Sequence, residues 1–255
     1  MALETLIVNG TIVDGTGNPW FKADVGVSNG KIAQVGKLVN ARAEKVIDAH
    51  GLVVAPGFID IHTHSDLSLL INPRAESKIR QGVTTEVIGN CGTSPAPARK
   101  ETLQFLKDEW GLEANAVKWN WQSFADYLHC LEEQGVALNV ASLVGHGAVR
   151  TAVMGVESRS PTRKEMEEMK DLVAQSMEEG AFGISTGLVY LPGCFAKTSE
   201  LIDLCKVVAK YGGFYASHTR GERETILDAL KEAIQIGERA RVPVQVSHNC
   251  PKYGG

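Results

Sequence analysis

Two histidines one residue apart follow an apolar stretch near the start of the chain. The stretch begins at Val53 and Val54 and ends at His62 and His64. In a strand, side chains two positions apart project from the same face, so the two imidazole rings are expected to point in one direction. A neutral imidazole nitrogen is a good zinc ligand, and two rings at one strand end could chelate the ion. Histidines that end a strand without binding a metal are the alternative for this motif alone.

Further metal-ligand side chains follow later apolar segments at corresponding points. Taken singly, each is more often a buried or hydrogen-bonded structural residue. Together they favour metal chemistry, because three or four imidazoles with one thiolate suit zinc, with cobalt or nickel as alternatives. A catalytic zinc ion activates water at neutral pH, and such a site hydrolyses a polarised carbonyl. The residues in question are Cys91, His146, His218 and His248.

The segments that would position these residues alternate between strand-like and helix-like patterns. Such alternation predicts β/α units on a parallel sheet, and polar groups at the carboxyl ends of the strands are typical of a (β/α)₈ barrel. A doubly wound sheet is the alternative fold, but its glycine-rich phosphate-binding turn does not follow the first strand. After the histidine pair, strands are expected at 84–88, 137–144, 181–186, 213–218 and 243–248. Helices are expected at 72–80, at 101–134 with an aromatic break at 119–121, and at 160–180, 199–211 and 223–239.

Residues 1–54 show a different pattern, with short strands separated by turn signals. Asn9–Gly10, Asp14–Gly15 and Ser28–Gly30 are sequences that favour hairpin turns. We therefore expect a small β module, part of a β-sandwich, at residues 1–54 and the barrel at residues 55–255.

Composition limits the class of protein. Of the 255 residues, 44% are hydrophobic and 22% are charged, which is typical of a soluble globular protein. A net charge of -4 without a long basic run argues against nucleic-acid binding, and neither a membrane span nor an export signal is visible. The five cysteines are odd in number and widely spaced, which indicates reduced thiols and a cytoplasmic location. The oligomeric state does not follow from the sequence.

Several of these motifs together resemble a known family. Residues 56–64, Pro-Gly-Phe-Ile-Asp-Ile-His-Thr-His, are similar to the first-strand motif of the amidohydrolase superfamily. Segments 89–92, 145–147, 183–188 and 217–222 then resemble the D-aminoacylase, or N-acyl-D-amino-acid deacylase, branch, and the likeness covers nearly the whole chain. The resemblance implies zinc-dependent hydrolysis of the amide bond of small N-acyl-D-amino acids by metal-activated water.

The same resemblance implies roles for individual residues. Cys91, His218 and His248 would form a tight zinc site, and His62 and His64 would belong to a second, weaker metal position. Many relatives bridge two metals with a carboxylated lysine from the fourth strand, where this chain has serine and threonine, so the thiolate of Cys91 would take that place.

Substrate binding is expected from four residues. Arg220 and Lys252 are candidates for binding a substrate carboxylate, although Lys252 could be a solvated loop residue and Arg220 could pair with Glu222 or Glu224. His146 and Tyr190, which follow the third and fourth strands, are the other two.

Two features of the family are expected beyond Gly255. The aspartate that acts as general base lies in the last barrel strand, and a C-terminal segment completes the β module. The chain is therefore expected to be a fragment that ends before the last strands. One alternative function is a cyclic-amide hydrolase of the dihydroorotase or hydantoinase type, which usually relies on the fourth-strand lysine; another is a catalytically incomplete metal-binding fragment.

Overall fold

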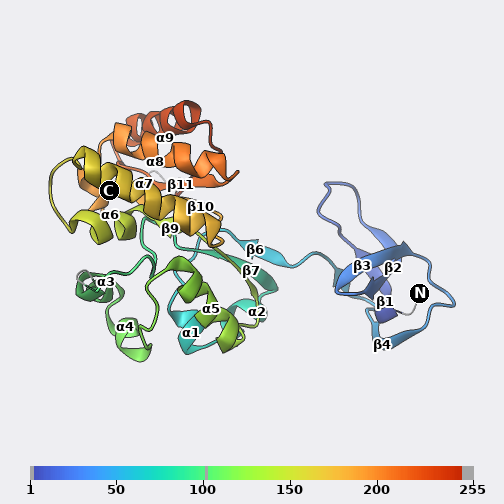
Figure 1. Cartoon of the computed structure of the whole chain (residues 1–255). Coiled ribbons are helices and arrows are strands. Elements are labelled where there is room, and N and C mark those ends of the chain that lie inside the picture. The colour runs from blue at the N-terminus through green and yellow to red at the C-terminus, as the bar shows by residue number, and fades with distance from the viewer. Residues whose placement is uncertain (1–2, 101–102, 249–255) are drawn as a thin grey trace. The chain divides into compact units, whose positions relative to one another are not determined.

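A computed structural model describes residues 3–100 and 103–248. The chain divides into two compact units, Met1–Phe58 and Ile59–Gly255 (Figure 1). Each unit has its own hydrophobic core. All of the described candidate ligands lie in the second unit.

The first unit is a β-sheet with the strand order β3-β2-β1-β4, in which β5 also pairs with β1. Strand β1 runs antiparallel to β2 and parallel to β4 and β5. A small core forms where Ile12, Ala23 and Val25 face inward. The strands are β1 (Leu3–Ile12), β2 (Phe21–Ser28), β3 (Lys31–Gly36), β4 (Ala43–Asp48) and β5 (Val53–Val54).

The hairpin turn expected at Asn9–Gly10 is wrong, because these residues lie inside the single strand β1. The pairing of β1 with β2 shifts register between Ile7 and Gly10, so the pair forms a bulge rather than a turn. Asn9 has φ 61°, its backbone N–H donates to Asp24 Oδ1 at 3.0 Å, and its side chain donates to Asp48 Oδ1 at 2.9 Å. Asn9 does adopt the left-handed conformation that favours a turn, but its hydrogen bonds to Asp24 and Asp48 stabilise that conformation inside the strand.

The second unit is built on strands that alternate with helices, so the predicted α/β class is confirmed. One sheet has the order β6-β7-β8 and the other β9-β10-β11-β12. Strand β7 is parallel to β8, and β9 to β12 are parallel to their neighbours. The strands are β6 (Phe58–Asp60), β7 (Val83–Ile88), β8 (Asn139–Ser142), β9 (Val144–Gly145), β10 (Gly183–Gly187), β11 (Phe214–His218) and β12 (Val244–Ser247).

Leu143 separates β8 from β9 and connects the two sheets. Its backbone N–H donates to Ile88 O at 3.0 Å, and Phe182 N donates to the neighbouring Ser142 O at 2.9 Å. The side chains of Leu143 and Ile88 are completely buried. Burial of a side chain of this size contributes about 1.5–3 kcal/mol, so this junction is well stabilised.

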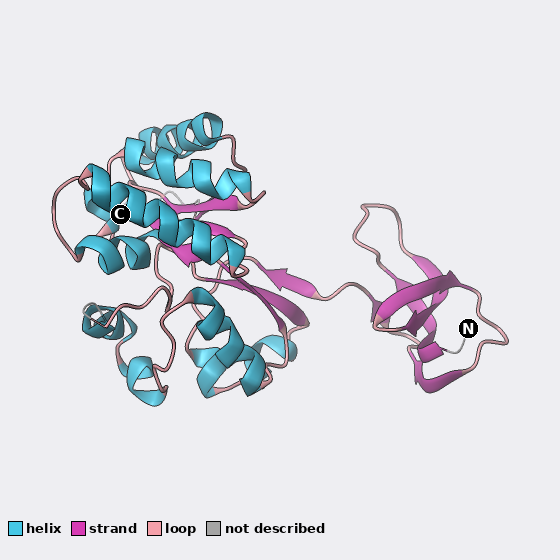
Figure 2. Cartoon of the chain, viewed as in Figure 1, coloured by secondary structure: helices cyan, strands magenta, loops and turns pink. Residues whose placement is uncertain are grey.

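Helices flank the strands of the second unit (Figure 2). Two of them begin with a capping box, in which Ser123 pairs with Asp126 and Thr162 pairs with Glu165. The described helices are α1 (Ser68–Ile71), α2 (Glu76–Ile79), α3 (Leu103–Trp110), α4 (Leu112–Ala116), α5 (Phe124–Gln134), α6 (His146–Met154), α7 (Arg163–Glu178), α8 (Thr198–Lys210) and α9 (Ile226–Ala240), with a short 3₁₀ turn η1 (Gly193–Phe195).

Some helix boundaries differ from those expected. The helix expected at 72–80 is shorter, because Asn72 ends α1 and α2 begins at Glu76. Helix α6 is not among the expected helices, since Gly145-His146-Gly147 has the composition of a loop. The helix is supported by burial around its whole circumference, because most of its side chains are buried and none is exposed. Within the described ranges, none of the helices is both long and apolar enough to span a bilayer.

Candidate metal centre

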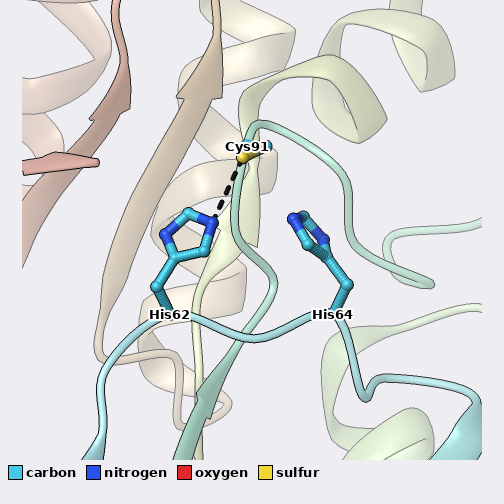
Figure 3. Close-up of side chains that lie close together, drawn as sticks. All are labelled: His62, His64 and Cys91. Carbon is cyan, nitrogen blue, oxygen red and sulfur yellow. Dashed lines mark hydrogen bonds between the residues drawn. The ribbon is translucent and has the colours of Figure 1, made fainter. Parts of the chain in front are cut away.

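The thiol of Cys91 lies among histidines that come from three different parts of the second unit. Its sulfur is 3.4 Å from Nε2 of His62, 3.5 Å from Nδ1 of His218 and 3.3 Å from Nε2 of His248. The rings of His62 and His64 lie 5.4 Å apart between centroids, and both point towards the Cys91 loop (Figure 3). The five side chains predicted as metal ligands therefore lie together.

Strand ends position these side chains. His62 and His64 lie just after β6, and the backbone N–H of Thr63 between them donates to Val87 O of β7 at 3.2 Å. His218 ends β11, and it is paired in register with Ser247, which ends β12 immediately before His248. Parallel strands bring their carboxyl ends to one edge of the sheet, so residues distant in sequence meet there.

The turn after β7 places Cys91. Gly89 has φ +74°, a conformation that L side chains rarely adopt, and a Cβ there would lie 2.0 Å from Leu143 O. Its backbone N–H donates to Oδ1 of Asp66 at 2.8 Å. Asp66 is completely buried, and this burial raises the pKa of its carboxyl to about 8. Asp66 thus joins the segment that follows His64 to the turn that leads to Cys91, a contact that the sequence pattern did not indicate.

The protonation of these groups follows from their burial. Desolvation, and then the neighbouring His248, His64 and His218, lower the pKa of His62 to about 4. Desolvation also lowers the pKa of His64, and it raises the pKa of the Cys91 thiol to about 12. Metal binding requires neutral imidazoles and a deprotonated thiol. The imidazoles of His62 and His64 are thus already in the form that binds a metal, whereas the thiol has to release its proton.

A carboxylate holds one of the imidazoles on its far side. Nε2 of His218 lies 3.1 Å from Oε1 of Glu222, whereas Nδ1 of the same ring faces Cys91. In metalloproteins such a carboxylate fixes the tautomer and the orientation of a ligand histidine. The sequence suggests Glu222 as a partner for Arg220, whereas its spacing of four residues from His218 is the signal for the contact observed.

The donor set and its spacing fit a zinc ion. Ligands at zinc–sulfur and zinc–nitrogen distances of about 2.3 and 2.0–2.1 Å lie about 3.5 Å apart in a tetrahedron, which is close to the sulfur–nitrogen separations observed. The donor atoms form two overlapping sets that share Cys91, within which all atoms lie within 4.8 Å of one another. The sets are His62, His64 and Cys91, and Cys91, His218 and His248.

A cavity of about 880 Å³ opens beside the cluster. His64 and Cys91 lie in its wall, so a bound molecule can reach the cluster. Tyr190 also lines the cavity, and its ring makes an edge contact with His218 at 5.0 Å between centroids. The remaining wall residues are Thr93, Phe105, Asp108, Trp110, Glu113, Val189 and Leu191.

Two of the other residues predicted to bind substrate, His146 and Arg220, lie elsewhere. The His146 ring is completely buried at the start of α6, where Nε2 lies 2.9 Å from Oε1 of Glu200. Arg220 makes two hydrogen bonds to Glu232, at 3.0 and 3.1 Å, so its partner is neither Glu222 nor Glu224. Neither His146 nor Arg220 lines the cavity beside Cys91. Lys252 lies outside the described residues.

Comparison with known families agrees with the fold. Residues 45–252 match the model of the amidohydrolase family, and residues 1–59 match that of the N-terminal domain of the urease alpha-subunit. The chain belongs to the amidohydrolase family. The resemblance predicted from the motifs is confirmed.

Individual relatives define the branch. A D-aminoacylase from Alcaligenes xylosoxydans xylosoxydans is 44% identical over 249 residues, which are 96% of this chain and 50% of the relative. An N-acyl-D-aspartate deacylase from the same organism is 40% identical over 247 residues, 96% of this chain and 49% of the relative. The chain thus spans about half the length of these curated relatives.

Solved structures give the same picture. The N-acyl-D-glutamate deacylase of Bordetella bronchiseptica, in complex with zinc and a phosphonate mimic of the tetrahedral intermediate, superimposes with a TM-score of 0.86 at 38% identity, over 96% of this chain and 51% of that chain. A crystal structure of D-aminoacylase gives the same TM-score at 41% identity and the same coverage. An L-hydantoinase from Arthrobacter aurescens shares the fold alone, with a TM-score of 0.59, 16% identity and coverage of 96% and 52%.

Proposed function

We propose that the protein hydrolyses the amide bond of N-acyl-D-amino acids with a metal bound at the Cys91 cluster. The observation that supports this most strongly is the meeting of one thiol and three imidazoles beside an open cavity. The names of three relatives, a D-aminoacylase, an N-acyl-D-aspartate deacylase and an N-acyl-D-glutamate deacylase, support this substrate class.

Each ligand has a part in the proposed site. Cys91, His218 and His248 would hold the tightly bound ion, with Glu222 orienting the His218 ring. His62 and His64 would provide a second, weaker position that shares the sulfur of Cys91. Zinc held by these residues would supply Lewis acidity, which would polarise an amide carbonyl and make water more acidic.

The cavity supports a mode of substrate binding. Its wall places Tyr190 next to His218, so a substrate that contacts this aromatic ring also lies near the metal ligands. We assign Tyr190 to direct substrate contact. Burial of His146 and the ion pair of Arg220 favour structural roles for these two residues, and Lys252 remains the candidate for the substrate carboxylate.

The complete architecture is also a proposal. The sequence pattern and the superposition on D-aminoacylase support a metal-dependent hydrolase barrel of the (β/α)₈ type, of which the described strands would form consecutive units. The two compact units support a division into a β module and a hydrolase domain.

The cyclic-amide alternative has weaker support. Its representative, the L-hydantoinase, shares only the fold, and β10 of this chain presents Ser185 and Thr186 where a lysine would be required. We therefore propose a linear N-acyl amide, and not a cyclic amide, as the substrate.

The test is release of free amino acid from N-acetyl-D-methionine by the purified 255-residue chain with added zinc. N-acetyl-L-methionine and the Cys91→Ala variant serve as controls. Turnover of the D enantiomer that requires both zinc and Cys91 is expected. Absence of turnover by a chain that has bound zinc would contradict the proposal and favour a metal-binding protein without activity.

A further inference from the structure

A single buried hydroxyl group contacts both sides of the loop that presents Cys91. Ser185 lies in β10, and its side chain is completely buried. Its Oγ accepts a hydrogen bond from the backbone N–H of Gly92 at 2.9 Å, and its hydroxyl donates to the backbone carbonyl of Gly89. The two bonded peptide groups lie on either side of Cys91 in the sequence, so Ser185 closes the loop around it.

Cys91 needs such support because of its own backbone. It has φ 54°, in the left-handed region that residues other than glycine adopt at a cost. A conformation of this kind persists only where the surrounding structure holds it. The bonds from Ser185 hold the Cys91–Gly92 peptide group and the Gly89–Asn90 peptide group that precedes it.

Strand β10, which contains Ser185, also limits where the Cys91 loop can move. A Cβ at Gly187 would lie 2.1 Å from Cys91 O, so the backbone of β10 packs directly against the loop. On the other side, Oδ1 of Asp66 accepts from Gly89 N. Within this arrangement, Ser185 is the side chain that bonds to the loop both before and after the cysteine.

We propose that Ser185 is a positioning residue for the metal site. Its hydroxyl fixes the loop that directs the sulfur of Cys91 towards the nitrogens of His62, His218 and His248. The inference rests on the proposed metal site and extends it, because Ser185 is not among the residues that could bind the ion. Loss of interactions that orient metal ligands weakens metal binding about ten- to a hundredfold.

The test compares zinc dissociation constants, measured by competition with a chromophoric chelator, for the wild-type chain, Ser185→Ala and Ser176→Ala. Ser176 is the matched control, because it is also a buried serine, and its hydroxyl donates to Leu172 O at 2.8 Å within α7. Ser185→Ala is expected to raise the zinc dissociation constant about ten- to a hundredfold. Ser176→Ala is expected to bind zinc as the wild type does.

Cobalt(II) provides a second measurement. With cobalt bound, the charge-transfer absorption from the Cys91 thiolate is expected to weaken or shift in Ser185→Ala and to stay unchanged in Ser176→Ala. If Ser185→Ala does not fold, as judged by circular dichroism, Ser185→Cys replaces it, because a thiol keeps a side chain there but is a weak donor and acceptor. The same weakening is expected for that variant.

The outcomes are distinct. Wild-type zinc affinity and an unchanged cobalt spectrum in the folded Ser185 variant would overturn the inference while leaving the proposed metal site intact. An equal loss in Ser185→Ala and Ser176→Ala would also overturn it, because any buried serine would then have the same effect. Failure of the wild-type chain to bind zinc would instead refute the proposed metal site itself.

Discussion

The sulfur of Cys91 lies 3.3 Å from Nε2 of His248, although 157 positions separate the two residues in the chain. Both residues have positive φ values, 54° and 51°, just after the ends of β7 and β12. Two non-glycine residues in this conformation at one site indicate that the surrounding structure is organised to hold them.

Glu222→Gln should weaken zinc binding about ten- to a hundredfold, because the amide replaces the carboxylate that orients His218. Glu224→Gln is the matched control, since Glu224 is an exposed glutamate in the same segment. The measurement is the zinc dissociation constant of each variant. Equal constants for the two variants would show that the contact between His218 and Glu222 does not support the site.

Gly89→Ala should lower the free energy of unfolding by about 3 kcal/mol or more. The added methyl group would clash with the carbonyl of Leu143, and alanine is also unfavourable at this positive φ. Gly135 has a similar φ of +70° with open space around it, so Gly135→Ala should lose only about 1–2 kcal/mol. Urea denaturation of both variants measures the difference. Equal losses would mean that the turn before Cys91 can relax.

Glu200→Gln tests a buried charge cluster. Burial by itself raises the pKa of Glu200. The hydrogen bond from His146 and the charges of His146 and Arg150 together lower it by more, so the pKa lies below the usual value of 4.5. A carboxyl with a lowered pKa in the folded state stabilises the protein above about pH 4.5. This stabilisation is lost as the pH falls through the folded-state pKa.

The variant should therefore be less stable at pH 7 by about 3–5 kcal/mol, because the buried Arg150 loses its carboxylate partner. It should also lose that part of the acid dependence of stability. Glu167→Gln, in an exposed pair with Lys170, should change stability by less than about 1 kcal/mol. The measurement is the free energy of unfolding of the wild type and both variants between pH 3 and 7. An unchanged pH dependence in Glu200→Gln would show that Glu200 does not stabilise the protein through its charge.

Tyr190→Ala should raise KM for N-acetyl-D-methionine by up to about tenfold, because the cavity loses an aromatic surface worth about 0.5–1.5 kcal/mol. Tyr211→Ala is the control, since its hydroxyl bonds to Glu178 and it does not line the cavity. Steady-state kinetics of both variants give the comparison. If the two substitutions had the same effect on KM, Tyr190 would have no direct contact with substrate.

Much of the cluster could be predicted from sequence, because its members follow apolar strands of consecutive β/α units. Cys91 and His218 are placed by β7 and β11, and a rule about strand ends suffices to bring such residues near one another. The rule fails for His146, which also follows a strand. The His146 ring is buried in the core, where it pairs with Glu200, 54 positions away in α8. The sequence around either residue does not indicate this pairing.

The missed features share a long-range cause. Arg220 pairs with Glu232, 12 positions away in α9, rather than with the glutamates next to it in sequence. In the sequence, Ser185 stands out only as a residue that is not a lysine, whereas in the structure it bonds to a loop that is 93 positions away at Gly92. A serine in a buried strand gives no indication of which backbone groups it will meet.

The most direct test of the central claim is zinc K-edge X-ray absorption spectroscopy of the zinc-loaded chain. We predict one sulfur scatterer at about 2.3 Å together with nitrogen ligands at about 2.0–2.1 Å, and loss of the sulfur scatterer in Cys91→Ala. A spectrum with nitrogen and oxygen ligands alone in the wild-type chain, or a sulfur scatterer that persists in Cys91→Ala, would contradict it.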